Sequence, residues 1–398
     1  MRIQTIHSFC AALLRRFPLE AGVSPQFSEM EDRTARLLRT EIVEDLAAGP
    51  QAATLYALAR HYSGETLDDL TSEITRHRSG FARPLSEADL AAAFDLPAGL
   101  SMAEIEARVF FGNESSLLNH LIPALQAGSS NDTKAAAKLS RITALDHRAL
   151  PIFEDVFLTG PGAKSPFSAK IGSFPTKATR EALGTVVDQI EQWMQRVADT
   201  RQTRLSFLAL QKTRALHAFA RAFLPAYEQA KQLRGWLDFD DLILRARDLL
   251  TDPAVAAWVL YRLDGGIDHI LVDEAQDTSP VQWQVIERLA QEFTSGQGAR
   301  PDTRRTIFVV GDKKQSIYSF QGADPREFDR MQRDFGARLE NTGTPLQSRV
   351  LAYSFRSSRA TLQPSIAASI KAKKAVLRRK RVTRHSSRPS PAVSTSGH

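Results

Sequence analysis

The sequence predicts an α/β protein in which a parallel sheet is interrupted by a long all-helical segment. Two short apolar runs, at 267–273 and 306–312, stand on either side of a helix pattern at 278–293. A strand, a helix and a second strand in this order form a βαβ unit, whose strands run parallel and are covered on both faces. From about 30 to 235, Ala, Leu, Glu and Arg dominate and helical patterns follow one another.

The first elements are expected to be helical. Residues 1–29 predict a short polar loop and then an amphipathic helix, which Pro18 ends. In the all-helical segment, 30–235, the stretches 128–133 and 160–175 are rich in loop-forming residues and predict loops.

The stretch from Glu181 to Arg234 predicts two long helices. One of them carries an apolar stripe formed by Val186, Val187, Ile190, Trp193, Met194 and Val197. A stripe at helical spacing is typical of core packing, and we interpret it so in preference to a binding site.

Residues 236–340 contain the predicted βαβ unit. Its helix has a clear start, with Ser279 as N-cap, Pro280 at the first helical position and Gln282 completing a capping box. The carboxyl ends of the two parallel strands then meet at one edge of the sheet, where open α/β sheets bind ligands.

Composition indicates an ordinary globular protein, with 42% hydrophobic and 24% charged residues among 398. The one cysteine, Cys10, excludes an internal disulfide framework and suits a reducing compartment. No apolar run approaches 18 residues and no secretory signal pattern opens the chain, so we expect a cytoplasmic protein.

The basic net charge of +7 comes from the last residues. Residues 341–363 predict another strand, at 348–356, and the start of a helix, whereas 364–398 have no apolar period and no acid. Without the nine Lys and Arg of this tail, 43 basic residues stand against 45 acidic ones, a net charge of −2. The tail is expected to be disordered. It could bind nucleic acid nonspecifically or be a solvated appendage; we favour a third interpretation, that it is non-native sequence.

Acidic residues end the first predicted strand. The stretch "LVDEAQDT" places Asp273 and Glu274 directly after the apolar run, and Asp277 one helical turn later. Two acids after a strand are often only a solvated turn. Here the next strand ends in "GDKKQS", which favours a site where Mg²⁺ is held on a phosphate and a water is oriented.

Four motifs occur in the order found in one family of motor proteins. They are "TIHSFC" (5–10), "VDEAQDTS" (272–279), "VVGDKKQSIYSFQGAD" (309–324) and "LAYSFRSS" (351–358). By these motifs the sequence resembles the superfamily-one DNA helicases of the UvrD/Rep/RecB group. Within that group, "SIYSFQGADP", "QTIHSFCAALLRRFPLEAGV" and the helical insertion most resemble the AddA subunits of AddAB helicase–nucleases of the alphaproteobacterial type. The resemblance implies a RecA-like motor domain of the P-loop NTPase class.

The resemblance also implies a nucleotide site for ATP and Mg²⁺. Asp273 would bind Mg²⁺, and Glu274 would orient and deprotonate the attacking water. Gln315 would contact the γ-phosphate, and Arg356 would stabilise the charge of the transition state from the second motor domain. The residues implied for this site are Asp273, Glu274, Gln276, Asp277, Gln315 and Arg356.

A DNA site is implied in the same way, by Thr5, His7, Tyr318 and Phe320. The first two would contact the phosphate backbone, and the two aromatic residues would stack on bases. A lone histidine is more often structural, and only the motif favours a DNA contact for His7. Gln276 and Asp277 would relay the nucleotide state to the DNA side. The acids of "LDFDDLI" (237–243) are interpreted as structural.

The phosphate loop G-x-x-x-x-G-K-[ST] does not occur in the sequence. The nearest stretch, "GPGAKSP" at 160–166, has Ala163 in place of the last glycine and no strand before it, so it predicts only a loop. In the resembled family the phosphate loop precedes "TIHSFC". We therefore expect an internal fragment that stops early in the second motor domain, before any nuclease domain, and that is inactive alone.

The implied function is ATP-driven 3′-to-5′ unwinding in double-strand-break repair. The implied partners are single- and double-stranded DNA and an AddB-like subunit. A solitary UvrD/Rep-type helicase is the alternative within the family. A remnant that only binds DNA or a partner is an alternative of another class. A Mg²⁺-dependent nuclease is a third, and the γ-phosphate residues Gln315 and Arg356 speak against it.

Overall fold

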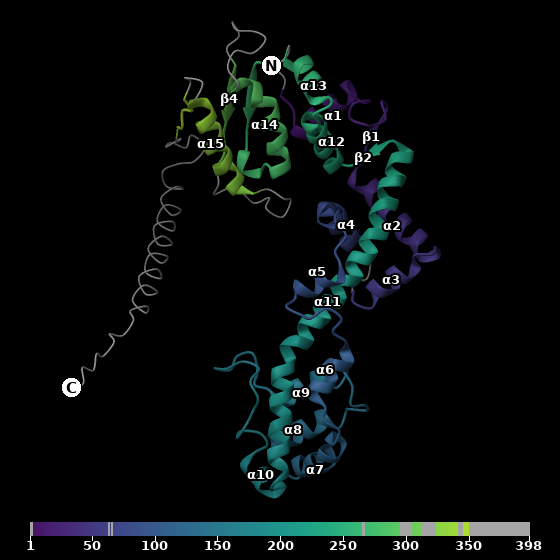
Figure 1. Ribbon diagram of the computed structural model, residues 1–398, viewed down its shortest axis with the longest axis vertical. Helices are drawn as coiled ribbons and strands as arrows, with labels where there is room; N and C mark the ends of the chain where they lie inside the picture. The colour runs from purple at the N-terminus through teal and green to yellow at the C-terminus, as the bar shows by residue number, and fades with distance from the viewer. Residues whose placement is uncertain are drawn as a thin grey trace, which may run out of the picture. The chain divides into compact units, whose positions relative to one another are not determined.

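The computed structural model describes residues 3–62, 64, 67–264, 267–294, 305–312, 324–340 and 345–349. It divides into two compact units (Figure 1), and each is considered by itself. The first unit comprises Met1–Gly266 and Gln284–Leu289, and the second comprises Ile267–Trp283 and Ala290–His398.

The first unit begins with helix α1 (Ile6–Arg16), which ends just before Pro18 as predicted. The Thr5 side chain caps it by accepting a hydrogen bond from the amide of Ser8. Its buried face packs on α12 (Phe239–Thr251), which is followed by α13 (Ala256–Asp264). The sequence therefore predicted this first helix correctly.

Two very short strands close the base of the helical segment. Strand β1 (Ser28–Glu29) pairs in parallel with β2 (Trp236–Leu237), although more than 200 residues of sequence separate them. Between them lie α2 (Asp32–Ala48), α3 (Ala52–Ala59), α4 (Asp68–Arg76), η1 (Arg78–Phe81), α5 (Glu87–Ala92), α6 (Met102–Val109), α7 (Glu114–Gln126), α8 (Ser130–Leu139), α9 (Leu150–Phe157), α10 (Lys177–Leu183) and α11 (Val186–Arg234). The helical stretch thus starts and ends at one place.

The expectation of two long helices between Glu181 and Arg234 was wrong. Only α10 and one continuous helix of 49 residues, α11, are present there. Gly184, with a positive φ of 56°, ends α10, and no glycine interrupts the chain again before Gly235. Pro225 lies inside α11 without ending it, because the residues around it are held in a buried apolar cluster.

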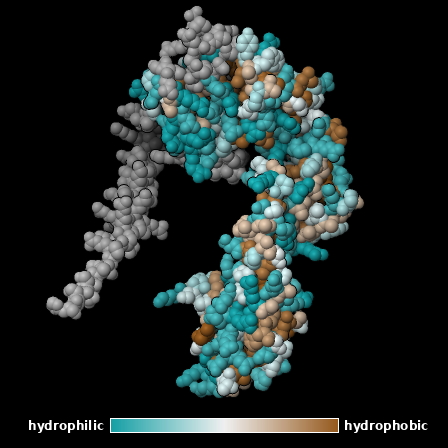
Figure 2. Space-filling model, viewed as in Figure 1, coloured by the Kyte–Doolittle hydropathy of each residue, from teal (hydrophilic) through white to brown (hydrophobic). Residues whose placement is uncertain are grey.

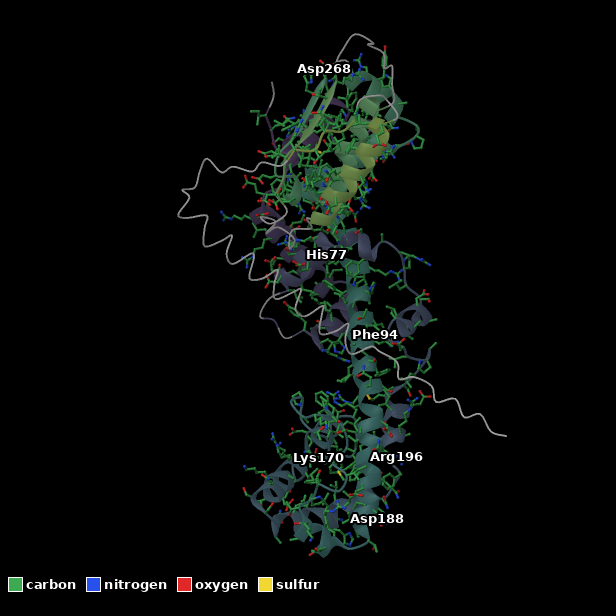
Figure 3. All side chains as sticks on the ribbon, turned by 90° about the vertical axis from the view of Figure 1, so that its left-hand side faces the viewer. His77, Phe94, Lys170, Asp188, Arg196 and Asp268 are labelled. Atoms are coloured by element: carbon green, nitrogen blue, oxygen red, sulfur yellow. The ribbon has the colours of Figure 1, made fainter. Side chains whose placement is uncertain are left out.

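Each half of α11 has its own core. The N-terminal half packs against α6, α7 and α9 around Trp193, whose ring centroid lies 4.5 Å from that of Phe153. Arg196 of the same half (Figure 3) donates to the carbonyl of Arg108 at 2.7 Å, at the C-terminal end of α6. The predicted stripe is confirmed as core, with only Val186 half-buried: Val187, Ile190, Trp193, Met194 and Val197 are buried.

The C-terminal half of α11 packs on α2 and α3. There the rings of Phe219, Phe223 and Tyr227 stack one turn after another, with centroids 5.5 and 5.8 Å apart. On the face drawn in Figure 2, hydrophobic residues reach the surface only as separate patches among hydrophilic ones. Within the described ranges, no helix has the length and apolar content that a membrane crossing needs.

The second unit contains the predicted parallel pair. Strand β3 (His269–Val272) pairs with β4 (Thr306–Val309), with Leu271 opposite Phe308. Helix α14 (Pro280–Thr294) lies between them in the sequence, and α15 (Pro325–Glu340) follows β4.

The start of α14 is as predicted. The Ser279 amide donates to Gln282 Oε1 at 2.9 Å, and the Gln282 amide donates to Ser279 Oγ at 3.3 Å, which completes the capping box. The additional strand predicted at 348–356 lies mostly outside the described residues, and 345–349 form neither helix nor strand.

The expectation that both faces of this sheet are covered was wrong for the described residues. Leu271 and Phe308 are 62% and 61% exposed, while their strand neighbours are half-buried. Their apolar composition indicates the surroundings that such strands require, but it does not supply a covering element. Nothing in the described part of the chain covers this face.

Candidate functional site

The candidate site begins where β3 ends. Asp273 and Glu274 follow Val272 directly, and Glu274 has the left-handed backbone conformation, with φ 51° and ψ 42°. For a residue other than glycine, this conformation costs about 1–2 kcal/mol. Asp273 Oδ1 accepts a hydrogen bond from the Glu274 amide at 3.0 Å. Backbone strain of this kind is concentrated at functional sites, because the surrounding structure must hold it in place.

The acids of this turn differ in exposure. Asp273 and Glu274 are exposed, whereas Asp277 is half-buried and its Oδ1 atom is buried without a hydrogen-bond partner. Among the described residues, no lysine or arginine pairs with any of the three. Two adjacent carboxylates therefore face outward without a neutralising cation in the described chain.

Gln276 connects this turn to the end of β4. Its side-chain Nε2 donates to Glu274 Oε2 at 2.6 Å, and its Oε1 accepts from the amide of Asp312 at 2.8 Å. The backbone continues the connection, because the Ala275 amide donates to the Val310 carbonyl at 2.9 Å. The turns after the two strands are thus held together, as the βαβ prediction requires.

This arrangement suits a hard cation that is shared with a phosphate. In the described chain, no group of three or more His, Cys, Asp and Glu could hold a metal ion by itself. Mg²⁺ is commonly bound by only one or two carboxylates, together with water and phosphate oxygens. Asp273 and Glu274 can provide such a partial set of ligands.

Four of the predicted site residues lie outside the described residues: Gln315, Tyr318, Phe320 and Arg356. Their roles stay predictions. Gly311 and Asp312, by contrast, contact Gln276 closely, and the sequence assigned them no role. The only signal for them was their place directly after the second predicted strand.

Thr5 and His7 belong to the first unit. The Thr5 hydroxyl is exposed at the cap of α1, and the half-buried ring of His7 packs edge-on against Phe239 at 5.5 Å. Burial lowers the pKa of His7, although Asp240 and Glu29 act in the opposite direction. His7 is therefore neutral near pH 7, and its imidazole can donate one hydrogen bond but offers no charge. Its contact with DNA stays a prediction.

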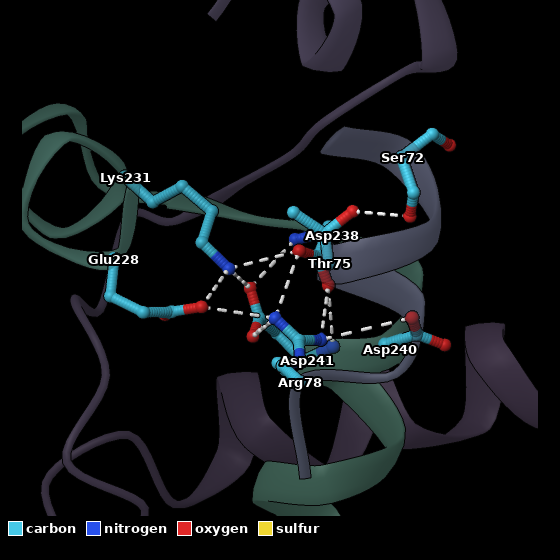
Figure 4. A network of polar contacts seen from close by, with 8 residues as sticks. All are labelled: Ser72, Thr75, Arg78, Glu228, Lys231, Asp238, Asp240 and Asp241. Carbon is cyan, nitrogen blue, oxygen red and sulfur yellow. Dashed lines mark hydrogen bonds and ion pairs between the residues drawn. The ribbon is translucent and has the colours of Figure 1, made fainter. Parts of the chain in front are cut away.

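The acids of "LDFDDLI" have a structural role, as interpreted from the sequence. Asp238 and Asp241 form the capping box of α12 and also meet two buried cations (Figure 4). Lys231 Nζ lies 2.9 Å from Asp238 Oδ2 and 2.6 Å from Asp241 Oδ2. Arg78 lies 2.9 Å from Asp238 Oδ1, and its other nitrogen is 3.0 Å from Glu228. We call these five residues the ionic cluster.

The pKa values of the ionic cluster follow from its neighbours. Burial by itself would raise the pKa of Asp238, but Arg78 and Lys231 outweigh it and hold that pKa well below its usual range. Burial and the nearby Asp238 raise the pKa of Asp241. Burial would lower the pKa of Lys231, but the two aspartates raise it above its usual value. No local pattern pointed to Arg78, because it lies 160 residues from Asp238.

Comparison with known proteins defines the class. The family model of the UvrD/REP helicase N-terminal domain matches residues 1–336, and the chain belongs to this family. That assignment agrees with the motif order in the sequence and with the acidic turn at the end of a parallel strand.

Curated relatives are more specific, and each is the A subunit of an ATP-dependent helicase/nuclease. The chain is 24% identical over 396 residues to the protein from Listeria innocua, covering 90% of this chain and 31% of the relative. It is 27% identical over 375 residues to the protein from Pelotomaculum thermopropionicum, covering 84% and 28%. For the Latilactobacillus sakei protein the values are 25% over 403 residues, 90% and 43%. The chain therefore spans less than half the length of these relatives.

Proposed function

We propose that this chain carries the ATP-hydrolysing carboxylates of a DNA helicase of the AddA type. The observation that carries the proposal is the strained, exposed Asp273–Glu274 pair at the carboxyl end of β3, with no cation of the described chain beside it. The names of the relatives, which include both "ATP-dependent" and "helicase", support the same activity.

In this proposal the two acids have separate roles. Asp273 holds Mg²⁺, which supplies charge neutralisation on the β- and γ-phosphates when it is bound. Glu274 accepts a proton from the attacking water through its carboxylate, which the αL turn directs away from the sheet. Gln315 and Arg356 act on the γ-phosphate, and Asp277 supports the turn.

The DNA side of the proposal depends on the motifs. Thr5 and His7 contact the phosphate backbone, and Tyr318 and Phe320 stack on bases of the single strand. The direction of movement is 3′ to 5′, the process is double-strand-break repair, and the partner is an AddB-like protein. Binding to such a partner distinguishes this proposal from a solitary UvrD/Rep-type helicase.

The experiment uses a fusion protein in which residues 1–358 replace the matched segment of the Listeria innocua relative. We expect DNA-stimulated ATP turnover that depends on Mg²⁺. Glu274→Gln keeps the shape of the side chain but removes the base, so turnover falls while ATP binding remains. Glu340→Gln, at the exposed end of α15, is the matched control and leaves turnover unchanged.

Two outcomes would overturn the proposal. One is a folded fusion protein that has no DNA-stimulated turnover although the unaltered relative has it. The other is Mg²⁺-dependent cleavage of DNA that needs no nucleotide and is lost with Glu274→Gln, which would favour a nuclease site.

A further inference from the structure

Gln276 is the most deeply buried polar residue of the acidic turn. Its side chain is 1% exposed, although the turn around it is open to solvent. The amide nitrogen donates to Glu274 Oε2 at 2.6 Å and lies 3.5 Å from Asp277 Oδ2. The amide oxygen accepts from the Asp312 amide at 2.8 Å. One side chain thus connects the predicted base to the backbone after the next strand.

The space for this connection depends on Gly311. A Cβ atom at that position would lie 2.8 Å from Gln276 Oε1 and 3.2 Å from the Cβ of Ala275. Both distances are shorter than ordinary van der Waals contact, so any larger residue would displace the amide. The absence of a side chain at Gly311 allows the two turns to approach this closely.

The connection leaves one oxygen of the base available. Glu274 Oε2 is occupied by the Gln276 amide, whereas Oε1 accepts no hydrogen bond from the described part of the chain. A carboxylate fixed through one oxygen presents the other in a defined direction. This is what a group that must accept a proton from one particular water requires.

We propose that Gln276 is a positioning residue for Glu274 and couples it to the segment after β4. The proposal rests on the proposed function, because it assumes that Glu274 is the base. Asp312 belongs to the "GDKKQS" segment, where Gln315 is predicted to contact the γ-phosphate. A displacement of the Asp312 backbone therefore moves the Gln276 amide and with it the Glu274 carboxylate. Gln276 acts through Glu274 and need not contact the nucleotide.

The test replaces Gln276 by Met in the fusion protein, which keeps the length of the side chain and removes both hydrogen bonds. The kcat for ATP is expected to fall about 10- to 100-fold, as is usual when a residue that orients a catalytic group is lost. The KM for ATP is expected to change by less than about threefold, because an interaction that acts only in the transition state is removed. A residue that only stabilises the fold would not separate kcat from KM in this way.

Gln282→Met is the matched control. It makes the same chemical change in the capping box of α14, away from the base. It is expected to lower the melting temperature and to leave kcat unchanged. If both variants lower kcat equally, the effect is one of stability and the proposal fails.

Gly311→Ala is a second variant that disturbs the same amide without removing it. It is expected to lower kcat in the same direction, and the double variant with Gln276→Met is expected to be no worse than the single Met variant. Hydrogen exchange of the 398-residue chain provides a readout that needs no activity. Gln276→Met should speed exchange at the Asp312 amide, whereas Gln282→Met should not.

The outcomes separate the two proposals. If Glu274→Gln abolishes turnover while Gln276→Met leaves kcat and the exchange of Asp312 unchanged, Gln276 does not position the base and only this inference fails. If Glu274→Gln leaves turnover unchanged, the proposed function itself fails.

Discussion

The two units use carboxylates in opposite ways. In the ionic cluster of the first unit, Asp238 and Asp241 are largely buried and each lies within 3.1 Å of Arg78 and of Lys231. In the second unit, Asp273 and Glu274 are exposed and have no cation beside them in the described chain. The comparison teaches that acids whose partners lie within the chain stabilise the fold, whereas acids without such partners are available for a ligand.

Backbone conformation differs in the same sense. Asp238, the N-cap of α12, has an ordinary extended backbone and forms a complete capping box with Asp241. Glu274 is held in the left-handed conformation, which costs free energy. A costly conformation beside exposed charge is expected where function, and not stability, determines the residue.

The largest effect is expected from breaking the ionic cluster. Lys231→Met leaves Asp238 and Asp241 facing each other with one cation fewer, and loss of a buried partner costs about 3–5 kcal/mol of unfolding free energy. Urea unfolding of the 398-residue chain measures it. Lys212→Met, at an exposed position of the same helix α11, is the control and should change stability by less than about 0.5 kcal/mol. Equal effects of the two variants would mean that the cluster does not stabilise the fold.

The pH dependence of stability sharpens the same comparison. Since the pKa of Asp238 is lowered in the folded state, its contribution is present above its unfolded pKa of about 4 and is lost as the pH falls below that value. The raised pKa of Asp241 acts in the opposite direction, because its contribution is present at low pH and is lost as the pH rises through its folded pKa.

The measurement is the urea midpoint of the 398-residue chain between about pH 6 and pH 3. The difference between the unaltered chain and Asp238→Asn should shrink toward low pH, by about 1–3 kcal/mol of unfolding free energy. Asp273→Asn should show no such trend, because its carboxylate is exposed. A difference for Asp238→Asn that stays constant with pH would contradict the account.

A smaller effect, of the opposite sign, is expected at the acidic turn. Glu274→Gly removes the cost of the left-handed conformation but gives the unfolded chain more freedom, so stability should stay within about 1 kcal/mol of the unaltered chain. Glu274→Val, which cannot easily adopt this conformation, should be clearly less stable than Glu274→Gly. If Glu274→Gly is strongly destabilising, the turn is a structural element like the ionic cluster.

The sequence predicted those features that depend on neighbouring residues. Pro18 located the end of α1, and Ser279 with Gln282 located the start of α14. The two apolar runs predicted a parallel pair, and the acids after the first run located the candidate site.

Features that depend on distant residues could not be predicted. Nothing near "LDFDDLI" indicates that Arg78 and Lys231 neutralise its acids. The apolar strands did not reveal that Leu271 and Phe308 would be exposed. The hydrogen bonds of Gln276 also depend on how the turns after β3 and β4 meet, which the motif alone does not specify.

The most direct test of the central claim is ATP turnover and stability measured on one variant, Glu274→Gln, in the fusion protein. The account predicts a fall in kcat on the order of 10²-fold or more, with ATP binding retained. It also predicts an unfolding free energy within about 0.5 kcal/mol of the unaltered protein, because the exposed carboxylate has no cation partner to lose. A kcat within about twofold of the unaltered protein would contradict the claim that these acids serve a ligand.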